Sequence, residues 1–185
     1  MPRPDDGIAE PFPTSRVNPS CRIVYVDSDP LVLVHAHALL TSTPEGACHY
    51  VQADVRDPDG IVEQAARTLD FEQPIALMLM GILGFVGDYD EARSIIRRLL
   101  DAVPSGNFLA LNDGTDPVYV AATDGYNQSG AVPYILRSRE QIAGYFDGLR
   151  LVEPGVVTLS RWRPEATRLG EPEEVAVAGA VARKP

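Results

Sequence analysis

The chain has 185 residues, a net charge of −10 and a pI of about 4.7. Hydrophobic residues make up 45% of the chain and charged residues 23%, which is typical of a folded protein and excludes a fully disordered one. The negative charge argues against binding nucleic acid or an anionic membrane through the general field of the protein. The sequence contains no apolar run long enough for a transmembrane helix. Its first residues lack the apolar stretch of a secretory signal, so we expect a cytoplasmic protein.

The predicted elements alternate between strands and helices. Five prolines within residues 1–20 predict an irregular N-terminal arm, followed by one domain over residues 21–185. We expect strands at 22–26, 49–53, 75–83, 106–111 and 175–181, helices at 31–40, 58–69, 89–103 and 138–146, and a bent strand or strand pair within 149–157. This alternation predicts a doubly wound α/β sheet, in which ligands bind beyond the carboxyl ends of the strands.

An acidic residue ends the first predicted strand, in Val24-Tyr25-Val26-Asp27-Ser28-Asp29-Pro30. A carboxylate has two acceptor oxygens and no donor, so Asp27 suits the vicinal hydroxyls of a nucleoside ribose. The alternative is a helix cap, which fits Asp29 better than Asp27 because Pro30 suits the first helical position.

The same arrangement returns after the second predicted strand, in Ala53-Asp54-Val55-Arg56-Asp57-Pro58. Asp54 could accept a hydrogen bond from an adenine amine, with the Val55 backbone facing the ring, whereas Asp57 suits a helix cap. Asp27 and Asp54 are 27 positions apart, as are Cys21 and Cys48. If the two strands are parallel neighbours in matching register, both acids lie at one sheet edge and both cysteines at the other. We therefore expect the thiols to have no nucleophilic role, and too few cysteines are present for a disulfide scaffold.

Two later motifs are candidates for ligand contact. Within Met78–Phe85 the strand is expected to end in small residues, which allow a flat ligand near the backbone, although core followed by a turn is the simpler interpretation. Asn112-Asp113-Gly114 is expected to be a turn after a strand, followed by a loop with Tyr119, Tyr126, Asn127 and Tyr134 that could line a substrate pocket. Asp113 and Tyr126 are the nearest candidates for a general base, and no catalytic residue is assigned. The histidines lack metal-ligand spacing, and neither a phosphate-binding loop nor a nucleophile elbow is present.

Taken together, these motifs resemble one protein family. The motifs around Asp27 and Asp54, the stretch Phe146–Val157, Trp162-Arg163-Pro164 and the final run Gly179–Pro185 resemble an actinobacterial family of S-adenosylmethionine-dependent methyltransferases, formerly a domain of unknown function. The resemblance implies a Rossmann-like class I methyltransferase sheet with S-adenosylmethionine as cofactor. It also implies cofactor contacts at Asp27, Ser28, Asp54, Val55, Met80 and Gly81, and a small-molecule substrate near Asp113, Tyr126 and Tyr134.

The chain departs from the family pattern in three places. Before Cys21 it shows neither the usual first strand nor the Gly-rich loop that follows it, so we expect a sheet without its first central strand and with unpaired strand edges. Gly84 stands where family members tend to carry histidine, and Asn112-Asp113-Gly114 differs from the usual Ser-His-Ala. The alternatives are therefore an inactive truncated relative, acting as a pseudoenzyme or assembly partner, and a nicotinamide-dependent oxidoreductase. The sequence does not decide between a monomer and a homo-oligomer.

Overall fold

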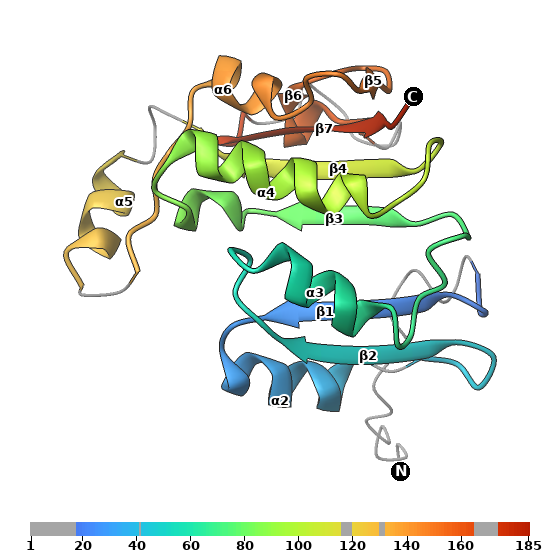
Figure 1. Ribbon diagram of the computed structural model, residues 1–185. Helices are drawn as coiled ribbons and strands as arrows, with labels where there is room; N and C mark the ends of the chain where they lie inside the picture. The colour runs from blue at the N-terminus through green and yellow to red at the C-terminus, as the bar shows by residue number, and fades with distance from the viewer. Residues whose placement is uncertain (1–17, 41, 116–119, 130–131, 165–173) are drawn as a thin grey trace, which may run out of the picture. The chain divides into compact units, whose positions relative to one another are not determined.

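The computed structural model describes residues 18–40, 42–115, 120–129, 132–164 and 174–185 (Figure 1). The chain divides into two compact units, Met1–Asp70 and Phe71–Pro185. Most of the predicted N-terminal arm lies outside the described residues. No helix in the described part of the chain is long and apolar enough to cross a membrane.

The first unit is built from two strands and two helices, β1 (Arg22–Asp27), α2 (Pro30–Leu39), β2 (Ala47–Gln52) and α3 (Pro58–Ala65). Both helices begin with proline, and each is capped by the preceding aspartate. Asp29 accepts a hydrogen bond from Leu31 N, and Asp57 accepts one from Gly60 N. Both predicted caps are confirmed, although α3 ends four residues earlier than expected.

The two strands pair in parallel, as predicted, but in a different register. Asp27 lies opposite Gln52 and Ile23 lies opposite Cys48, so the expected matching of Asp27 with Asp54 and of Cys21 with Cys48 is wrong. The strands are displaced by two residues from that matching. Because side chains alternate with a period of two, the displacement keeps the same residues on each face of the sheet. Asp54 thus lies just beyond the end of β2.

The second unit contains a mixed sheet in the order β3-β4-β7-β5, with β6 also paired to β7. Its strands are β3 (Ala76–Met80), β4 (Phe108–Gly114), β5 (Arg150–Leu151), β6 (Val157–Thr158) and β7 (Val177–Arg183). Its helices are η1 (Leu83–Phe85), α4 (Tyr89–Asp101), α5 (Val120–Asn127), α6 (Arg139–Gly144) and η2 (Leu159–Arg161). β3 and β4 are parallel, and β7 runs antiparallel to β4.

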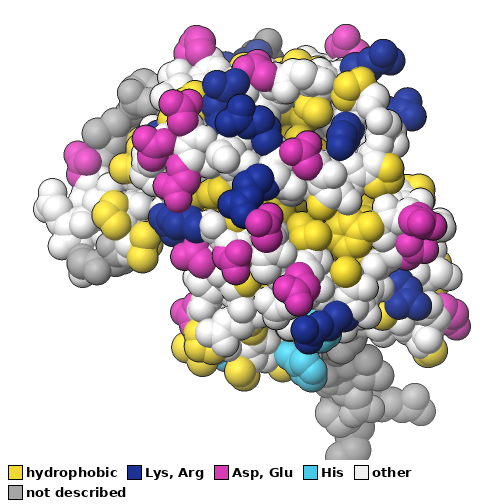
Figure 2. All heavy atoms as spheres, in the orientation of Figure 1, with side chains coloured by type: hydrophobic (Ala, Val, Ile, Leu, Met, Phe, Trp, Pro, Cys, Tyr) yellow, Lys and Arg dark blue, Asp and Glu magenta, His cyan; other side chains and the backbone are white. Residues whose placement is uncertain are grey.

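Helix α4 shows why this unit folds. Its aliphatic side chains recur at helical spacing and are all buried, while most of its remaining positions carry charges (Ala92, Ile95, Ile96, Leu99 and Leu100 are the buried ones). Leu109 and Leu111 of β4 are also buried in this unit. Figure 2 shows basic and acidic side chains interspersed over the outer face of α4. The predicted helix and its apolar stripe are confirmed.

Three predicted boundaries in the second unit are wrong. Asn112-Asp113-Gly114 is not a turn but the end of β4, because β7 supplies backbone partners as far as the pair Gly114 and Val177. Tyr126 and Asn127 lie in α5 rather than in a loop, and Tyr119 is outside the described residues. The strand expected to reach Leu83 stops at Met80, where Gly81 adopts a φ of 67°.

The expected unpaired strand edges are present among the described residues. β1 is hydrogen-bonded only to β2, and β3 only to β4. On the same strands the side chains of Val26, Met78 and Met80 are exposed, at 37%, 62% and 47% of their surface. Unpaired edges of this kind are unusual for hydrophobic strands, because such strands normally have a hydrogen-bonded neighbour on each side.

Candidate functional site

The first candidate site lies at the carboxyl ends of β1 and β2 in the first unit. Asp27 is half-buried, and its Oδ1 accepts a hydrogen bond from Asp29 N at 2.8 Å. Its Oδ2 has no hydrogen bond within the described chain. Asp27 therefore tightens the turn into α2 with one oxygen, and this geometry is compatible with both the ribose and the turn interpretations.

The loop after β2 adjoins this carboxylate. Ala53 N donates to Asp27 O at 3.1 Å, and Gln52 Nε2 donates to Ser28 O at 3.4 Å. These bonds bring Asp27, Ser28 and the loop that follows Ala53 to one edge of the two-stranded sheet, as the sequence predicted. A ligand bound at this edge would face both loops.

Asp54 is exposed and is held by its own loop. Its Oδ1 accepts from Arg56 N at 2.8 Å, and Arg56 Nη1 lies 3.3 Å from both carboxylate oxygens. Exposed ion pairs of this kind are weak, so a ligand amine could replace the guanidinium at little cost. Val55, between the two, is half-buried.

The second candidate site lies at the carboxyl ends of β3 and β4 in the second unit. Gly81 N donates to Asn112 O at 3.0 Å, and Asn112 Nδ2 lies 3.0 Å from Met80 Sδ. The positive φ of Gly81, rather than crowding, explains the glycine, because a Cβ there would approach its nearest neighbours only to about van der Waals contact. Met80 and Gly81 thus form part of the rim of this end of the sheet.

Asp113 is the buried centre of this second site. Its side chain is fully buried, and Oδ1 accepts hydrogen bonds from the Tyr134 hydroxyl and from Gly114 N. Oδ2 is buried without a hydrogen-bond partner among the described residues. Burial raises the pKa of Asp113, and it outweighs the hydrogen bonds and the charge of Arg137, which act to lower it.

Tyr134 is held from three sides. Gly114 N donates to its hydroxyl oxygen at 3.0 Å, and the side chain of Asn127 clamps its backbone N–H and C=O with bonds of 2.8 and 3.0 Å. Its ring lies against Gly84, where any Cβ would overlap the ring atoms. Burial, together with the bond to Asp113, raises the pKa of Tyr134, so the side chain remains a neutral phenol at neutral pH.

Beside this phenol the second unit has a pocket of about 310 Å³ lined by Phe85, Thr123, Tyr126 and Tyr134. The Phe85 ring meets Tyr134 edge to face with centroids 4.9 Å apart, and meets Tyr126 similarly at 6.4 Å. Aromatic edges and faces attract one another and would attract a ring-shaped ligand in the same way. Of the predicted substrate residues, Tyr126 and Tyr134 line this pocket and Asp113 lies behind Tyr134.

Arg137 is a buried cation next to this group. Its Nη2 donates to Val86 O at 2.6 Å and to Gly87 O at 3.1 Å, and its guanidinium carbon lies 5.7 Å from the centre of the Tyr89 ring. Tyr145 is also buried in this region, and burial raises its pKa to about 12. The Arg137 charge favours the ionised form of Asp113 and so limits the effect of burial on that carboxyl.

Phe85 and Arg137 had no predicted role of their own. Phe85 ended an apolar run, and Asn127 was predicted only as one member of the loop that could line a substrate pocket. Arg137 gave no signal at all, because one arginine beside an apolar stretch is not distinguishable from a surface residue.

Comparison with known proteins assigns the chain to a family. A family model described as S-adenosyl methyltransferase matches residues 14–185. The chain belongs to the S-adenosyl methyltransferase family. The predicted resemblance and the predicted cofactor class are thereby confirmed.

Solved structures agree with this assignment. A DUF574 family protein from Streptomyces avermitilis is 42% identical, with a TM-score of 0.83, and the match covers 92% of this chain and 68% of that one. A candidate methyltransferase from Thermobifida fusca is 32% identical, with a TM-score of 0.77. The match covers 92% of this chain and 65% of that one. The chain thus spans about two thirds of these relatives.

More distant structures share the fold alone. The N-methyltransferase NodS from Bradyrhizobium japonicum, in complex with S-adenosyl-L-homocysteine, is 13% identical with a TM-score of 0.54, and the match covers 93% of this chain and 71% of that one. The predicted Rossmann-like class I methyltransferase fold is confirmed. A comparison with curated protein sequences finds no significant match.

Proposed function

We propose that this member of the S-adenosyl methyltransferase family binds S-adenosylmethionine through the loops of its first unit. The observation that carries the proposal is the hydrogen bond from Ala53 N to the backbone oxygen of Asp27, which joins the end of β1 to the start of the loop that holds Asp54 and Val55. Oδ2 of Asp27 is available to a ribose hydroxyl, and the Asp54 loop to an adenine ring. When bound, the cofactor supplies an electrophilic methyl group. Ser28 in the first unit is proposed as a further cofactor contact, and the contacts that the resemblance implies at Met80 and Gly81 remain predictions from the sequence.

The pocket of the second unit is proposed to hold the methyl acceptor. Three of its four lining residues are aromatic, and the Tyr134 hydroxyl oxygen already accepts one bond, from Gly114, and donates one, to Asp113. This oxygen has one lone pair left for an acceptor hydroxyl or amine. We therefore propose a small aromatic or heteroaromatic acceptor that carries such a group.

Asp113 and Tyr134 would carry the acceptor's proton. An O–H or N–H that donates to Tyr134 Oη passes its proton to that oxygen while Tyr134 passes its own proton to Asp113 Oδ1. The phenol is neutral before and after the transfer, and the carboxylate ends as a carboxylic acid. Because burial raises the pKa of Asp113, this carboxyl is a better proton acceptor than an exposed aspartate. Loss of the proton makes the acceptor atom more nucleophilic.

Binding of S-adenosyl-L-homocysteine tests the cofactor role of the first unit. Isothermal titration calorimetry should show that Asp27→Asn lowers the affinity by tenfold or more, because the amide replaces one acceptor oxygen with a donor. Asp29→Asn is the matched control, since it removes the same charge two residues away and asparagine caps a helix as well as aspartate. Equal affinities for the two variants would refute the role of Asp27. Absence of binding by the unmodified chain would favour the inactive relative.

Methyl transfer from tritiated S-adenosylmethionine to a panel of phenols, catechols and aromatic amines tests the acceptor role of the second unit. NAD in place of S-adenosylmethionine tests the oxidoreductase alternative. A preference for aliphatic acceptors would contradict the aromatic pocket. The small-molecule substrate and the cytoplasmic location remain predictions from the sequence.

A further inference from the structure

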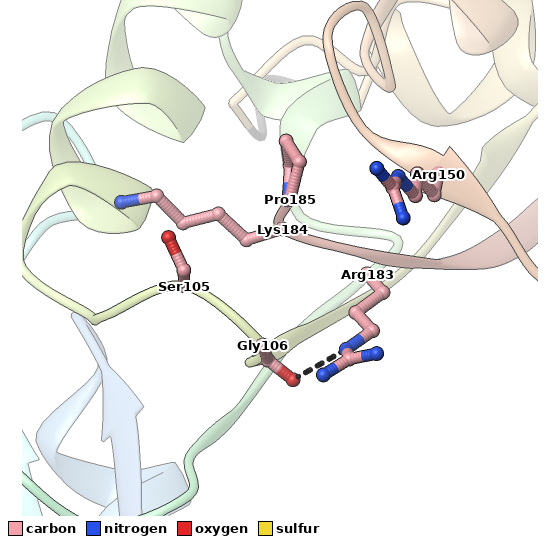
Figure 3. Close-up of a pocket in the computed structure, with 6 residues that line it drawn as sticks. All are labelled: Ser105, Gly106, Arg150, Arg183, Lys184 and Pro185. Carbon is pink, nitrogen blue, oxygen red and sulfur yellow. Dashed lines mark hydrogen bonds between the residues drawn. The ribbon is translucent and has the colours of Figure 1, made fainter.

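A second pocket of the second unit, of about 220 Å³, is basic (Figure 3). It is lined by Ser105, Gly106, Arg150, Arg183, Lys184 and Pro185. It lies at the end of the sheet away from Asp113. β4 runs from Phe108, the register partner of Arg183, to Asp113, a length of about 17 Å at about 3.3 Å per residue. A ligand bound here would therefore be separate from one bound at the aromatic pocket.

Arg150 and Arg183 are directly opposite one another on the antiparallel strands β5 and β7. Side chains so paired point to the same face with Cβ atoms about 5 Å apart, and like charges in this position repel. The described residues offer little compensation. Arg183 Nε donates to Gly106 O at 3.2 Å, Arg150 has no hydrogen bond, and neither forms an ion pair.

Lys184 does not add its charge to the pocket. Its Nζ donates to Leu100 O and Val103 O, both at 2.8 Å, at the end of α4. Figure 3 shows its side chain directed away from the two arginines. Arg150 and Arg183 are thus the cations that face the pocket, in a chain with 26 acidic residues and 16 lysines and arginines. Their opposition in register, without an ion pair among the described residues, is the feature that needs an explanation.

We propose that Arg150 and Arg183 together bind the phosphate group of a small molecule. Guanidinium groups present paired N–H donors in a plane, which match the oxygens of a phosphate, and an anion between the two cations removes their repulsion. The Ser105 hydroxyl at the pocket wall is a further donor. The site does not serve the methyl donor, which carries no phosphate.

Phosphate binding to the full chain can be measured by ³¹P NMR line broadening and by calorimetry at constant ionic strength. Inorganic phosphate and glycerol 3-phosphate are the two probes, and they distinguish a site for the free ion from one for a phosphomonoester. We expect Arg150→Gln to weaken binding by tenfold or more. Arg150 makes no hydrogen bond or ion pair with the described residues, so this variant should fold normally. Arg183→Lys keeps the charge but loses the planar fork, and it should also weaken binding.

Arg97→Gln is the matched control, because Arg97 is an exposed arginine of α4 and its loss changes the net charge equally. It should bind both probes as the unmodified chain does. Equal affinities for Arg150→Gln and Arg97→Gln would overturn the proposal, as would the absence of saturable binding of either probe to the unmodified chain. Competition between phosphate and S-adenosyl-L-homocysteine would also overturn it, because the binding would then belong to the cofactor site. None of these results depends on methyltransferase activity.

Discussion

Replacing Tyr134 with phenylalanine removes one oxygen from the centre of the second unit. That oxygen donates to Asp113 Oδ1 and accepts from Gly114 N. Without it, the buried carboxylate keeps Gly114 N as its donor on Oδ1 while Oδ2 has no partner. Hydrogen bonds to charged groups contribute about 1.5–3 kcal/mol, so the free energy of unfolding should fall by about 2–3 kcal/mol.

Urea denaturation of the full chain, monitored by circular dichroism, measures this loss. Tyr126→Phe is the control, because Tyr126 lines the same pocket but is 43% exposed and its hydroxyl has no hydrogen bond within the described chain. It should change the free energy of unfolding by less than about 0.5 kcal/mol. Combining Tyr134→Phe with Asp113→Asn should cost at least about 1 kcal/mol less than the sum of the single changes, because the unpaired charge is absent.

The same variant tests the proton path. Rates of methyl transfer should fall by about 10²-fold or more in Tyr134→Phe, since positioned acid–base groups contribute about that much, while the affinity for S-adenosyl-L-homocysteine stays within twofold. If Tyr134→Phe lost no more stability than Tyr126→Phe, the stabilising role of the hydrogen bond between Tyr134 and Asp113 would be refuted. An unchanged rate in a folded Tyr134→Phe variant would refute the proton path.

Three further predictions concern the same unit. Gly84→Ala should lower the free energy of unfolding by about 1–3 kcal/mol because its Cβ overlaps the Tyr134 ring, whereas Gly87→Ala, whose Cβ meets open space, should be nearly neutral in the same urea assay. The raised pKa of Asp113 means that the folded state binds its proton more tightly than the unfolded state. The stability of the unmodified chain relative to Asp113→Asn should therefore fall as pH rises from the ordinary carboxyl pKa to the raised one, by at most about 1.4 kcal/mol per pH unit; a flat or rising difference would contradict the pKa assignment. Leu111→Ala should cost about 2–5 kcal/mol because Leu111 is fully buried, and Leu151→Ala, at an exposed position of β5, should cost less than about 1 kcal/mol; similar losses would show that β4 is not the core strand.

Residues close in sequence determined most of the secondary structure. Asp29 with Pro30 and Asp57 with Pro58 predicted where α2 and α3 begin, and the spacing of Ile95, Ile96 and Leu99 predicted the buried face of α4. These features depend on contacts within three or four residues, which the order of amino acids specifies directly. The position of Asp27 at the end of a strand and before a helix could be predicted for the same reason.

The second site depended on partners that local patterns do not contain. Asp113 belongs to a strand because β7, far along the chain, pairs with it, and its burial follows from that pairing. Tyr134 reaches Asp113 because Gly84 leaves room for its ring and Asn127 clamps its backbone. The opposition of Arg150 and Arg183 likewise exists only once β5 and β7 are in register. By itself the sequence determined most strands and helices, the caps of α2 and α3, and the family. Only the tertiary structure decided where β4 ends, that α5 is a helix and which side chains meet, because cross-strand hydrogen bonds and packing between distant segments set those distances.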